Sequence, residues 1–380
     1  MARATGLEPA TTGSTVRYSN QIELRPHGLP TRVPGIEGAG LYGGPTGPSS
    51  PSSTFHREGR APGKTEIGRI SYPRPCYPAG PSMSEFNPPA NLSSSPGSRR
   101  IRIVFNADDL GVSTGNNTGI ATACEAGLVR EASLCVTGGA VEEGAEVARR
   151  LAGRVNLGLH LSFTLGKPLT GPLPGLCDDE GRFLPLKTVL RRCLFSCLDQ
   201  ERLREEIEAQ IRAVQDLGFE ISHINGHHHV HVYPQIAAAL AEVLGRKPIP
   251  YLRLPLATQR KYFGLRGTFL GLLSRIFTAR VDRGISLAPP LPLLGLGAFG
   301  RKDYRKIFEE TARNLRPGTY EWMVHPRNPD PSFALMDHLD PSKEERCRFE
   351  LETLCDPGTK VLLEELGIEV TDYRSIAAAS

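Results

Sequence analysis

Hydrophobic and polar positions from Arg100 onward fall into two alternating patterns. Short apolar runs rich in β-branched residues predict strands, and longer stretches with apolar residues three and four apart predict helices between them. The expected strands are 101–107, 133–137, 155–161, a segment ending at 223–225, 251–254 and 320–324. The expected helices are 114–127, opened by the capping candidates Ser113 and Thr114 and closed by Gly127, then 141–151, 201–217, 234–244 and 303–315.

Strands that alternate with helices are typical of a parallel sheet whose faces are covered by helices. Because six or seven such units follow one another, we expect an α/β fold whose sheet closes, or nearly closes, into a (β/α) barrel. Enzymes with this architecture build their active sites at the C-terminal ends of the strands. Polar residues at these ends are therefore the first candidates for chemistry.

The first hundred residues differ in composition from the rest of the chain. They hold 15 of the 32 prolines and 14 of the 40 glycines, and ten Arg and one Lys face only six Glu. Such a segment cannot bury enough apolar surface to offset its chain entropy, so we expect a disordered extension over residues 1–98 and a folded domain over residues 99–380. An Arg-rich, acid-poor N-terminus also fits an organelle transit peptide, which Glu8, Glu23 and the many prolines disfavour.

The charge balance beyond residue 100 is close to neutral, because 34 basic and 35 acidic residues remain there. This balance gives no electrostatic basis for nucleic-acid or membrane partners. The chain has no run of 18 apolar residues, no apolar core of a secretory signal, and no second cysteine pair to build a zinc knuckle with Cys193 and Cys197. We therefore expect a cytoplasmic protein whose thiols are reduced and buried or half-buried.

Two adjacent carboxylates close the first expected strand, in Asn106-Ala107-Asp108-Asp109. Successive residues of a strand face opposite ways, but where the chain turns both side chains can reach one site. Such a pair suits a division of work in which one carboxylate binds a metal and the other takes a proton. The alternative is structural, with Asp109 capping the helix that follows.

Histidines mark two further strand ends. His160 follows an apolar run, and taken alone it is better explained as a core histidine. Four imidazoles lie within five residues at His227, His228, His229 and His231, a density that indicates metal binding. Which of the four would bind stays open, because an extended segment would pair His227 with His229 and a turn would change that pairing.

The last expected strand ends in Val324-His325-Pro326, where Pro326 stops the ladder and fixes the turn. His325 would act as an acid or base, or would only pack, and Glu321 is a candidate to support it. Arg253, at the end of another strand, would bind a substrate hydroxyl, orient Asp108 or form an ion pair at the barrel mouth. A carboxylate with two histidines describes an open metal site that leaves room for a nucleophilic water.

Together these motifs resemble the YdjC-like carbohydrate deacetylases, also called chitooligosaccharide deacetylases. The resemblance runs from about residue 102 to the C-terminus. It rests on Asn106-Ala107-Asp108-Asp109-Leu110-Gly111, Gly158-Leu159-His160-Leu161, Gly166-Lys167-Pro168-Leu169, the histidine run followed by Pro234, and His325-Pro326. It implies a (β/α) barrel of the glycoside hydrolase/deacetylase type, a divalent metal and a carbohydrate substrate.

Matched residue by residue, the resemblance implies that Asp109, His160 and His227 bind the metal, that Asp108 is the general base, and that His325 is the general acid. Mg is the metal we favour, and Zn, Mn and Co also suit a mixed oxygen and nitrogen site. Many family members have Asp two residues before the first histidine of the run, where this chain has Asn225. If that carboxylate holds the imidazole, its absence should weaken metal binding or activity by about 10–100-fold.

The expected function is metal-dependent removal of acetyl groups from acetylated amino-sugar oligosaccharides. Two alternatives stay open: a metal-dependent hydrolase of another substrate class, and a non-catalytic scaffold on the same barrel. The near-neutral domain disfavours a phosphoester substrate, and the intact set of site residues disfavours a scaffold. Two apolar segments, 265–276 and 287–299, are candidates for a homodimer interface or a lid, and the second resembles an insertion more than a barrel element.

Overall fold

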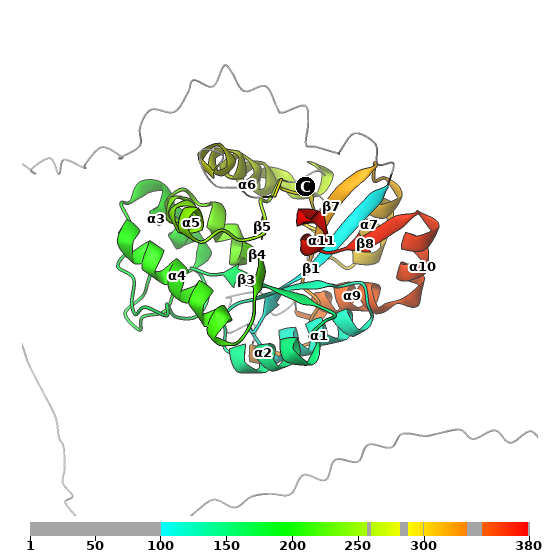
Figure 1. The fold of residues 1–380 in the computed structure, drawn as a ribbon, viewed down its shortest axis with the longest axis horizontal. Coiled ribbons are helices and arrows are strands. Elements are labelled where there is room, and N and C mark those ends of the chain that lie inside the picture. The colour runs from blue at the N-terminus through cyan, green and yellow to red at the C-terminus, as the bar shows by residue number, and fades with distance from the viewer. Residues whose placement is uncertain (1–99, 257–259, 282–287, 299, 333–343, 379–380) are drawn as a thin grey trace, which may run out of the picture. The chain divides into compact units, whose positions relative to one another are not determined.

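A computed structural model describes residues 100–256, 260–281, 288–298, 300–332 and 344–378. The extension predicted over residues 1–98 lies outside these ranges. The described part is a curled sheet of parallel strands with helices around it (Figure 1). The strands are β1 (Ile101–Leu110), β2 (Glu131–Leu134), β3 (Asn156–Leu161), β4 (Ile221–Gly226), β5 (Tyr251–Leu252), β6 (Leu293–Leu294), β7 (Gly318–Val324) and β8 (Ile368–Thr371).

Seven of these strands run in the order β5-β4-β3-β2-β1-β7-β6. The central strand β1 pairs with β7 along Ile101–Ala107, with β2 from Asn106 onward, and with β8 from Ile101 to Val104. β1 is buried from Ile103 to Leu110, so buried and exposed positions do not alternate along it, and its polar residues Asn106, Asp108 and Asp109 are buried as well. The pairs among these eight strands are all parallel, so the C-terminal ends of β1, β3, β4 and β7 meet at one end of the sheet.

Helices fill the connections between successive strands. Side-chain caps begin four of the described helices. Ser113 Oγ accepts from Asn116 N at the start of α1, and Asp199, Asp356 and Asp372 accept from backbone N–H groups at the starts of α4, α10 and α11. Of the described helices, none combines the length and apolarity needed to cross a membrane. The helices are α1 (Thr114–Glu125), α2 (Val141–Arg150), α3 (Leu186–Phe195), α4 (Gln200–Asp216), the short turn η2 (His227–Val232), α5 (Pro234–Arg246), α6 (Arg260–Val281), α7 (Tyr304–Arg313), α9 (Glu344–Cys355), α10 (Pro357–Glu365) and α11 (Tyr373–Ala377).

The predicted α/β barrel is confirmed in the form of a curled sheet, and no ladder joins β5 to β6 among the described residues. The two edges are linked just beyond β5, where Leu293 N lies 3.0 Å from Leu256 O. Assigning all of residues 287–299 to an insertion was wrong, because Leu293 and Leu294 form β6 and pair with β7. A two-residue strand is too short to show any periodicity in the sequence.

Two of the element boundaries that differ from the sequence prediction lie beside the predicted site residues. β1 continues through both carboxylates to Leu110, and β2 ends at Leu134, because Cys135 N turns to bond Leu110 O at 2.8 Å. The prediction for the cysteines holds for Cys193 on α3, which is buried, and was wrong for Cys197, which is exposed.

The apolar segment 265–276 lies within α6. Its Leu270 and Leu273 are buried, as is Phe277, whereas Leu272 and Ile276, one turn apart, are exposed. A homodimer through this helix therefore stays a prediction.

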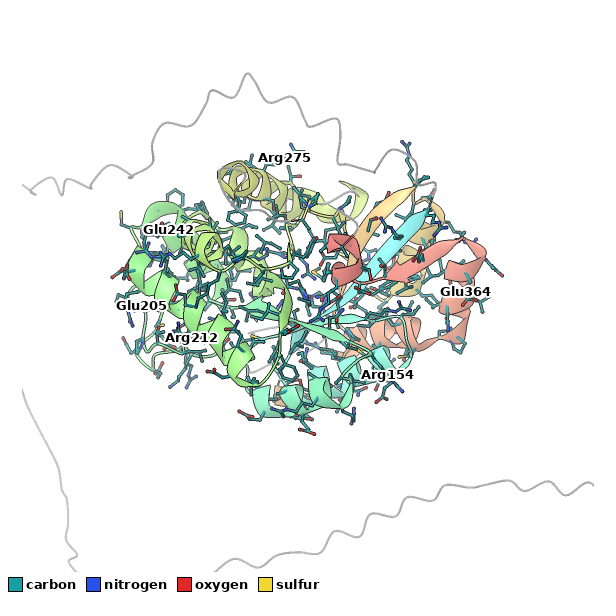
Figure 2. All side chains as sticks on the ribbon, viewed as in Figure 1. Arg154, Glu205, Arg212, Glu242, Arg275 and Glu364 are labelled. Atoms are coloured by element: carbon teal, nitrogen blue, oxygen red, sulfur yellow. The ribbon has the colours of Figure 1, made fainter. Side chains whose placement is uncertain are left out.

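The core between sheet and helices contains an aromatic cluster. The ring of Trp322 on β7 lies 5.7 Å from that of Phe105 on β1 and 4.4 Å from that of Phe308 on α7. Charged side chains such as Arg212 and Glu242 lie on the outer faces of the helices (Figure 2). Two cavities of about 290 and 550 Å³ lie near the N-terminal ends of β2 and β3, and the predicted site residues line neither of them.

Candidate functional site

The turn after β1 directs two adjacent carboxylates into one site. The pairing of β1 with β2 is irregular between Ala107 and Leu110, and Asp109 adopts a left-handed φ of 71°. Gly111 follows with φ 84°, and a Cβ there would lie only 2.9 Å from Leu134 Cδ1. This irregularity breaks the alternation of the strand, so both Asp108 and Asp109 are buried at the same end of the sheet.

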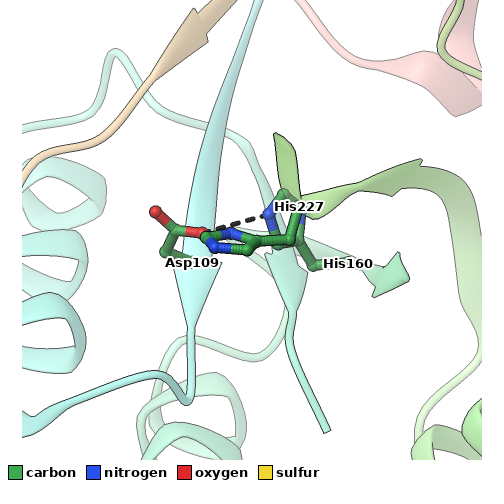
Figure 3. Close-up of side chains that lie close together, drawn as sticks. All are labelled: Asp109, His160 and His227. Atoms are coloured by element: carbon green, nitrogen blue, oxygen red, sulfur yellow. Dashed lines mark hydrogen bonds and ion pairs between the residues drawn. The ribbon is translucent and has the colours of Figure 1, made fainter. Parts of the chain in front are cut away.

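Asp109, His160 and His227 converge as the resemblance implied. Asp109 Oδ1 lies 3.0 Å from His160 Nε2 and 3.0 Å from His227 Nδ1. The three side chains come from the ends of β1 and β3 and from the turn after β4, and they point toward one another (Figure 3). All three are buried, and their ligand atoms lie within 4.8 Å of one another.

Their geometry fits a divalent metal. In an octahedral site with bonds of about 2.1 Å, neighbouring ligand atoms are about 3.0 Å apart, the separation found on both sides of Asp109 Oδ1. Burial opposes ionisation of Asp109, but the imidazoles of His227 and His160 outweigh it and hold its pKa well below the usual range. The carboxylate is therefore ionised at neutral pH, as a metal ligand must be.

Asn225 on β4 sets the orientation of His160. Its Oδ1 lies 2.7 Å from His160 Nδ1, so Nδ1 carries the hydrogen and Nε2 presents its lone pair toward Asp109 and the metal position. The side chain two residues before His227 thus contacts His160 and not the histidine run that it precedes. The Asn225 amide also donates to Asp108 Oδ1 at 3.1 Å, a contact that a carboxylate could not make.

Asp108 lies at the centre of a buried hydrogen-bond network. Arg253 Nη1 donates to its Oδ2 at 2.5 Å, and Arg253 Nη2 donates to its Oδ1 at 2.9 Å. Asn106 Nδ2 and Ser133 Oγ add donors to Oδ1 at 2.7 and 3.3 Å. Burial opposes ionisation, but the Arg253 guanidinium outweighs it, so the pKa of Asp108 lies well below its usual range.

Arg253 is held from its other side by Glu321. The Arg253 Nε donates to one oxygen of Glu321, and Tyr251 Oη donates to the other at 3.0 Å. Arg253 and Glu321 are both fully buried. Of the three roles considered for Arg253, the structure therefore supports orientation of Asp108, and the suggestion that Glu321 supports His325 was wrong.

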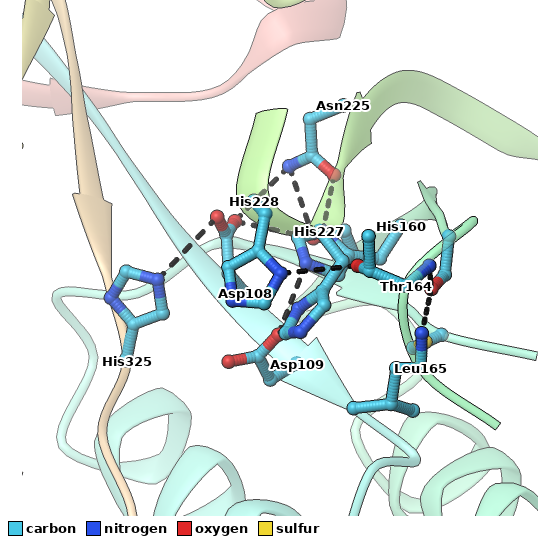
Figure 4. A network of polar contacts seen from close by, with 12 residues as sticks. Asp108, Asp109, His160, Thr164, Leu165, Asn225, His227, His228 and His325 are labelled. Atoms are coloured by element: carbon cyan, nitrogen blue, oxygen red, sulfur yellow. Dashed lines mark hydrogen bonds and ion pairs between the residues drawn. The ribbon is translucent and has the colours of Figure 1, made fainter. Parts of the chain in front are cut away.

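His325 faces the same carboxylate from the end of β7. Its Nε2 lies 3.8 Å from Asp108 Oδ2, and its side chain is 17 % exposed (Figure 4). Burial lowers the pKa of His325, an effect that the nearby carboxylates Asp109 and Asp108 only partly oppose. The ring is therefore neutral at neutral pH.

The remaining histidines of the run have separate surroundings. His228 and His229 both adopt left-handed backbone conformations, with φ of 54° and 59°, so the segment is a turn and does not pair His227 with His229 on one face. His231 Nε2 lies 2.8 Å from the Arg253 carbonyl oxygen, and burial lowers the pKa of His231 to about 3. His231 therefore stays neutral and supports the strand end that carries Arg253.

Three further side chains in the site were not predicted from the sequence. Asn106 lies inside a recognised motif but had no role assigned, and Ser133 and Thr164 had no distinguishing pattern. Ser133 Oγ lies 3.3 Å from His160 Nδ1, and Thr164 Oγ1 lies 3.0 Å from His228 Nδ1. A single hydroxyl residue beside an apolar strand is too common to be recognised as functional.

Comparison with known proteins agrees with these motifs. The family model described as YdjC-like protein matches residues 102–365. A carbohydrate deacetylase of Vibrio cholerae serotype O1 is 29 % identical over 279 residues, which cover 73 % of this chain and 98 % of that protein. A carbohydrate deacetylase of Homo sapiens is 34 % identical over 212 residues, covering 54 % of this chain and 61 % of that one.

A chitooligosaccharide deacetylase of Enterobacter sp. strain 638 is 37 % identical over 148 residues, covering 39 % of this chain and 57 % of that protein. Among solved structures, a protein of Enterococcus faecalis V583, named for cellobiose-phosphate cleavage, has the same fold. Its TM-score is 0.57 at 21 % identity, covering 73 % of this chain and 98 % of that one. With the family model matching well over half of its length, the chain belongs to the YdjC-like family of carbohydrate deacetylases.

Proposed function

We propose that this protein is a metal-dependent hydrolase that removes acetyl groups from N-acetylated amino-sugar oligosaccharides and releases acetate. The observation that carries the proposal is the convergence of Asp109, His160 and His227 beside Asp108 and His325. The names of the relatives, carbohydrate deacetylase and chitooligosaccharide deacetylase, support the substrate class.

Asp109, His160 and His227 would hold the metal, through one carboxylate oxygen and two imidazole nitrogens. A bound divalent metal would supply polarisation of the acetyl carbonyl and would lower the pKa of water from about 15.7 towards 7. Mg is the metal we favour, and Zn, Mn and Co also suit a site with one oxygen and two nitrogen ligands.

The network around Asp108 selects which oxygen takes the proton from the attacking water. Oδ1 accepts from Arg253, Asn106, Asn225 and Ser133, so its lone pairs are occupied. Oδ2 accepts from Arg253 Nη1 and otherwise faces His325. We therefore assign Oδ2 as the general base, and we assign Arg253 to hold it in place.

His325 is assigned as the residue that protonates the departing amine. Because burial lowers its pKa, the ring must gain a proton during the reaction before it can donate one. Asp108 Oδ2, 3.8 Å away, is positioned to pass on the proton it took from water. The water oxygen bonds to the carbonyl carbon and the C–N bond breaks. One proton of the water ends on the amine nitrogen and the other is lost from the new carboxyl group, giving acetate and a free amino sugar.

The decisive experiment measures acetate release from N,N′-diacetylchitobiose and related acetylated sugars. Metal-stripped protein is resupplied with Mg, Zn, Mn or Co in turn, and Asp108→Asn is the control. Metal-dependent release that disappears in the variant supports the proposal. If no sugar releases acetate although metal binds stoichiometrically, the substrate belongs to another class, and absence of both metal and activity indicates a scaffold.

A further inference from the structure

The segment that follows β7 packs directly against the backbone of helix α1. A Cβ at Gly119 would lie 2.2 Å from Arg327 Cα, and a Cβ at Gly115 would lie 2.5 Å from the carbonyl oxygen of Asn328. Neither position has room for a side chain, so helix and segment touch backbone to backbone. Asn328 N also donates to Gly115 O at 3.0 Å.

Asp330 fastens this segment to the first turn of α1. Its Oδ2 accepts from Gly115 N at 2.8 Å, although the two residues are 215 positions apart in the sequence. Its Oδ1 accepts from the backbone N–H and the hydroxyl of Ser332, at 2.9 and 2.7 Å. Burial opposes ionisation, but the hydrogen bonds from Gly115 and Ser332 outweigh it and lower the pKa of Asp330 to about 2. The side chain is therefore a carboxylate at neutral pH, as suits the positive end of a helix.

The chain between His325 and Asp330 is short and stiff. Two of the four residues between them are prolines, Pro326 and Pro329. Proline fixes its own φ and restricts the residue before it. Pro326 and Arg327 are also buried. The position of Asp330 is therefore transmitted along the segment to His325.

The same part of α1 holds the turn that carries the assigned base. Asn117, which is fully buried, accepts from Gly111 N at 2.7 Å in the turn directly after the two carboxylates. The ends of β1 and β7 are thus both tied to the first turns of one helix. Asp108 and His325, whose Oδ2 and Nε2 lie 3.8 Å apart, come from these two strand ends (Figure 4).

We propose that Asp330 is a positioning residue: by fastening the segment after β7 to α1, it holds His325 where it can take a proton from Asp108 and pass it on. This inference rests on the deacetylase function and on the role of His325 proposed above. A displacement of about 1 Å caused by a change far from the reacting atoms can lower a rate about 100-fold. A clamp five residues from the acid can therefore affect turnover without touching the metal ligands.

The test compares Asp330→Ala with Asp330→Asn. Ala removes the acceptor for Gly115 N, and we expect kcat for N,N′-diacetylchitobiose to fall about tenfold, with KM and metal content unchanged. Asn keeps an oxygen acceptor and should retain most of the activity.

Asp199→Ala is the matched control. Asp199 also accepts from a backbone N–H in the first turn of a helix, that of Glu201 at 3.0 Å, and its helix α4 carries none of the assigned residues. Asp199→Ala should lower the melting temperature to a similar extent as Asp330→Ala and leave kcat unchanged.

A double-mutant cycle separates positioning from a general structural effect. If Asp330 acts through His325, adding Asp330→Ala to His325→Ala should lower kcat no further than His325→Ala alone. Gly119→Ala displaces the same segment at Arg327 and should likewise lower kcat only while His325 is present. Losses that multiply in the double variants would overturn the inference.

Full activity in Asp330→Ala, or an equal fall of kcat in Asp199→Ala, would also contradict the role of Asp330. Loss of bound metal in Asp330→Ala would do the same, because the clamp would then support the metal ligands. A fully active His325→Ala protein would refute the acid assignment and this inference with it. An inactive wild type contradicts the deacetylase function itself, whereas an active wild type with an unaffected Asp330→Ala variant contradicts only the positioning role.

Discussion

Arg253 donates to both carboxylate oxygens of Asp108, at 2.5 and 2.9 Å, and both side chains are almost completely buried. The planar guanidinium fixes the carboxylate plane as well as its charge, because two parallel hydrogen bonds define an orientation that a point charge would not. Glu321 fixes the guanidinium in turn. The carboxylate assigned as the base is therefore prepositioned by residues from β5 and β7.

Arg253→Lys should preserve the positive charge and lose the two-pronged geometry. We expect kcat to fall tenfold or more, with metal still bound, and stability to fall by about 1–3 kcal/mol. Arg253→Met should destabilise by about 3–5 kcal/mol, because it leaves Asp108 and Glu321 buried without a cation. Chemical denaturation and metal analysis check both variants, and a fully active Arg253→Lys protein would contradict the positioning role.

Asp108→Asn should retain metal and lose most turnover. Asn cannot accept the proton from water, and removal of a general base typically lowers kcat by about 10²–10⁴-fold. Acetate release and metal content are measured on the same sample. An active variant would rule out the assignment of Asp108 as the base.

Two variants should distinguish a histidine that binds the metal from one that only stabilises the surrounding structure. His227→Ala removes a proposed ligand atom beside Asp109 and should lose bound metal, whereas His231→Ala should keep it, because His231 contacts the Arg253 carbonyl. The His231 variant should instead be less stable, by about 1–3 kcal/mol for the buried carbonyl left unpaired. Calorimetric titration with metal distinguishes them, and equal metal affinity in both would refute the ligand set.

Asn225→Asp should strengthen metal binding at His160 and make the proposed base, Asp108, harder to deprotonate. A carboxylate beside His160 Nδ1 should make that imidazole a stronger ligand, by about 10–100-fold in affinity. The same carboxylate would lie about 3 Å from Asp108 Oδ1 and raise the pKa of Asp108. The base would then protonate at higher pH, so the acidic limb of the kcat profile should move upward, and a limb that stays in place would contradict this coupling.

The buried carboxyl group of Glu350 on α9 should make the folded protein less stable as the pH rises. Burial raises the pKa of Glu350 from 4.5 to about 8. Below 4.5 both folded and unfolded states hold the proton, and between 4.5 and 8 only the folded state does, so stability falls as pH rises through this window. Glu350→Gln should therefore melt several degrees higher than wild type above pH 8 and equally near pH 4, as thermal scans at the two pH values would show.

The sequence predicted those residues of the candidate site that follow directly after an apolar strand. Asp108, Asp109, His160 and His325 each close an apolar strand, and parallel strands bring such ends together. The pairing of Arg253 with Glu321 was not predictable, because it joins β5 to β7 across the interior of the curled sheet. The role of each histidine in the run depends on two consecutive left-handed residues, which no propensity for histidine would suggest.

The pairing of β1 with three partners has a consequence for how the molecule is made. β2 follows β1 closely in the chain, but β7 and β8 come more than two hundred positions later, and the bond from Tyr373 N to Glu131 spans 242 positions. Until those distant segments are synthesised, the edge of β1 has unpaired N–H and C=O groups, which are prone to pair with other chains. The nascent polypeptide should therefore complete its barrel late and slowly, and it should benefit from chaperones that shield this edge during translation.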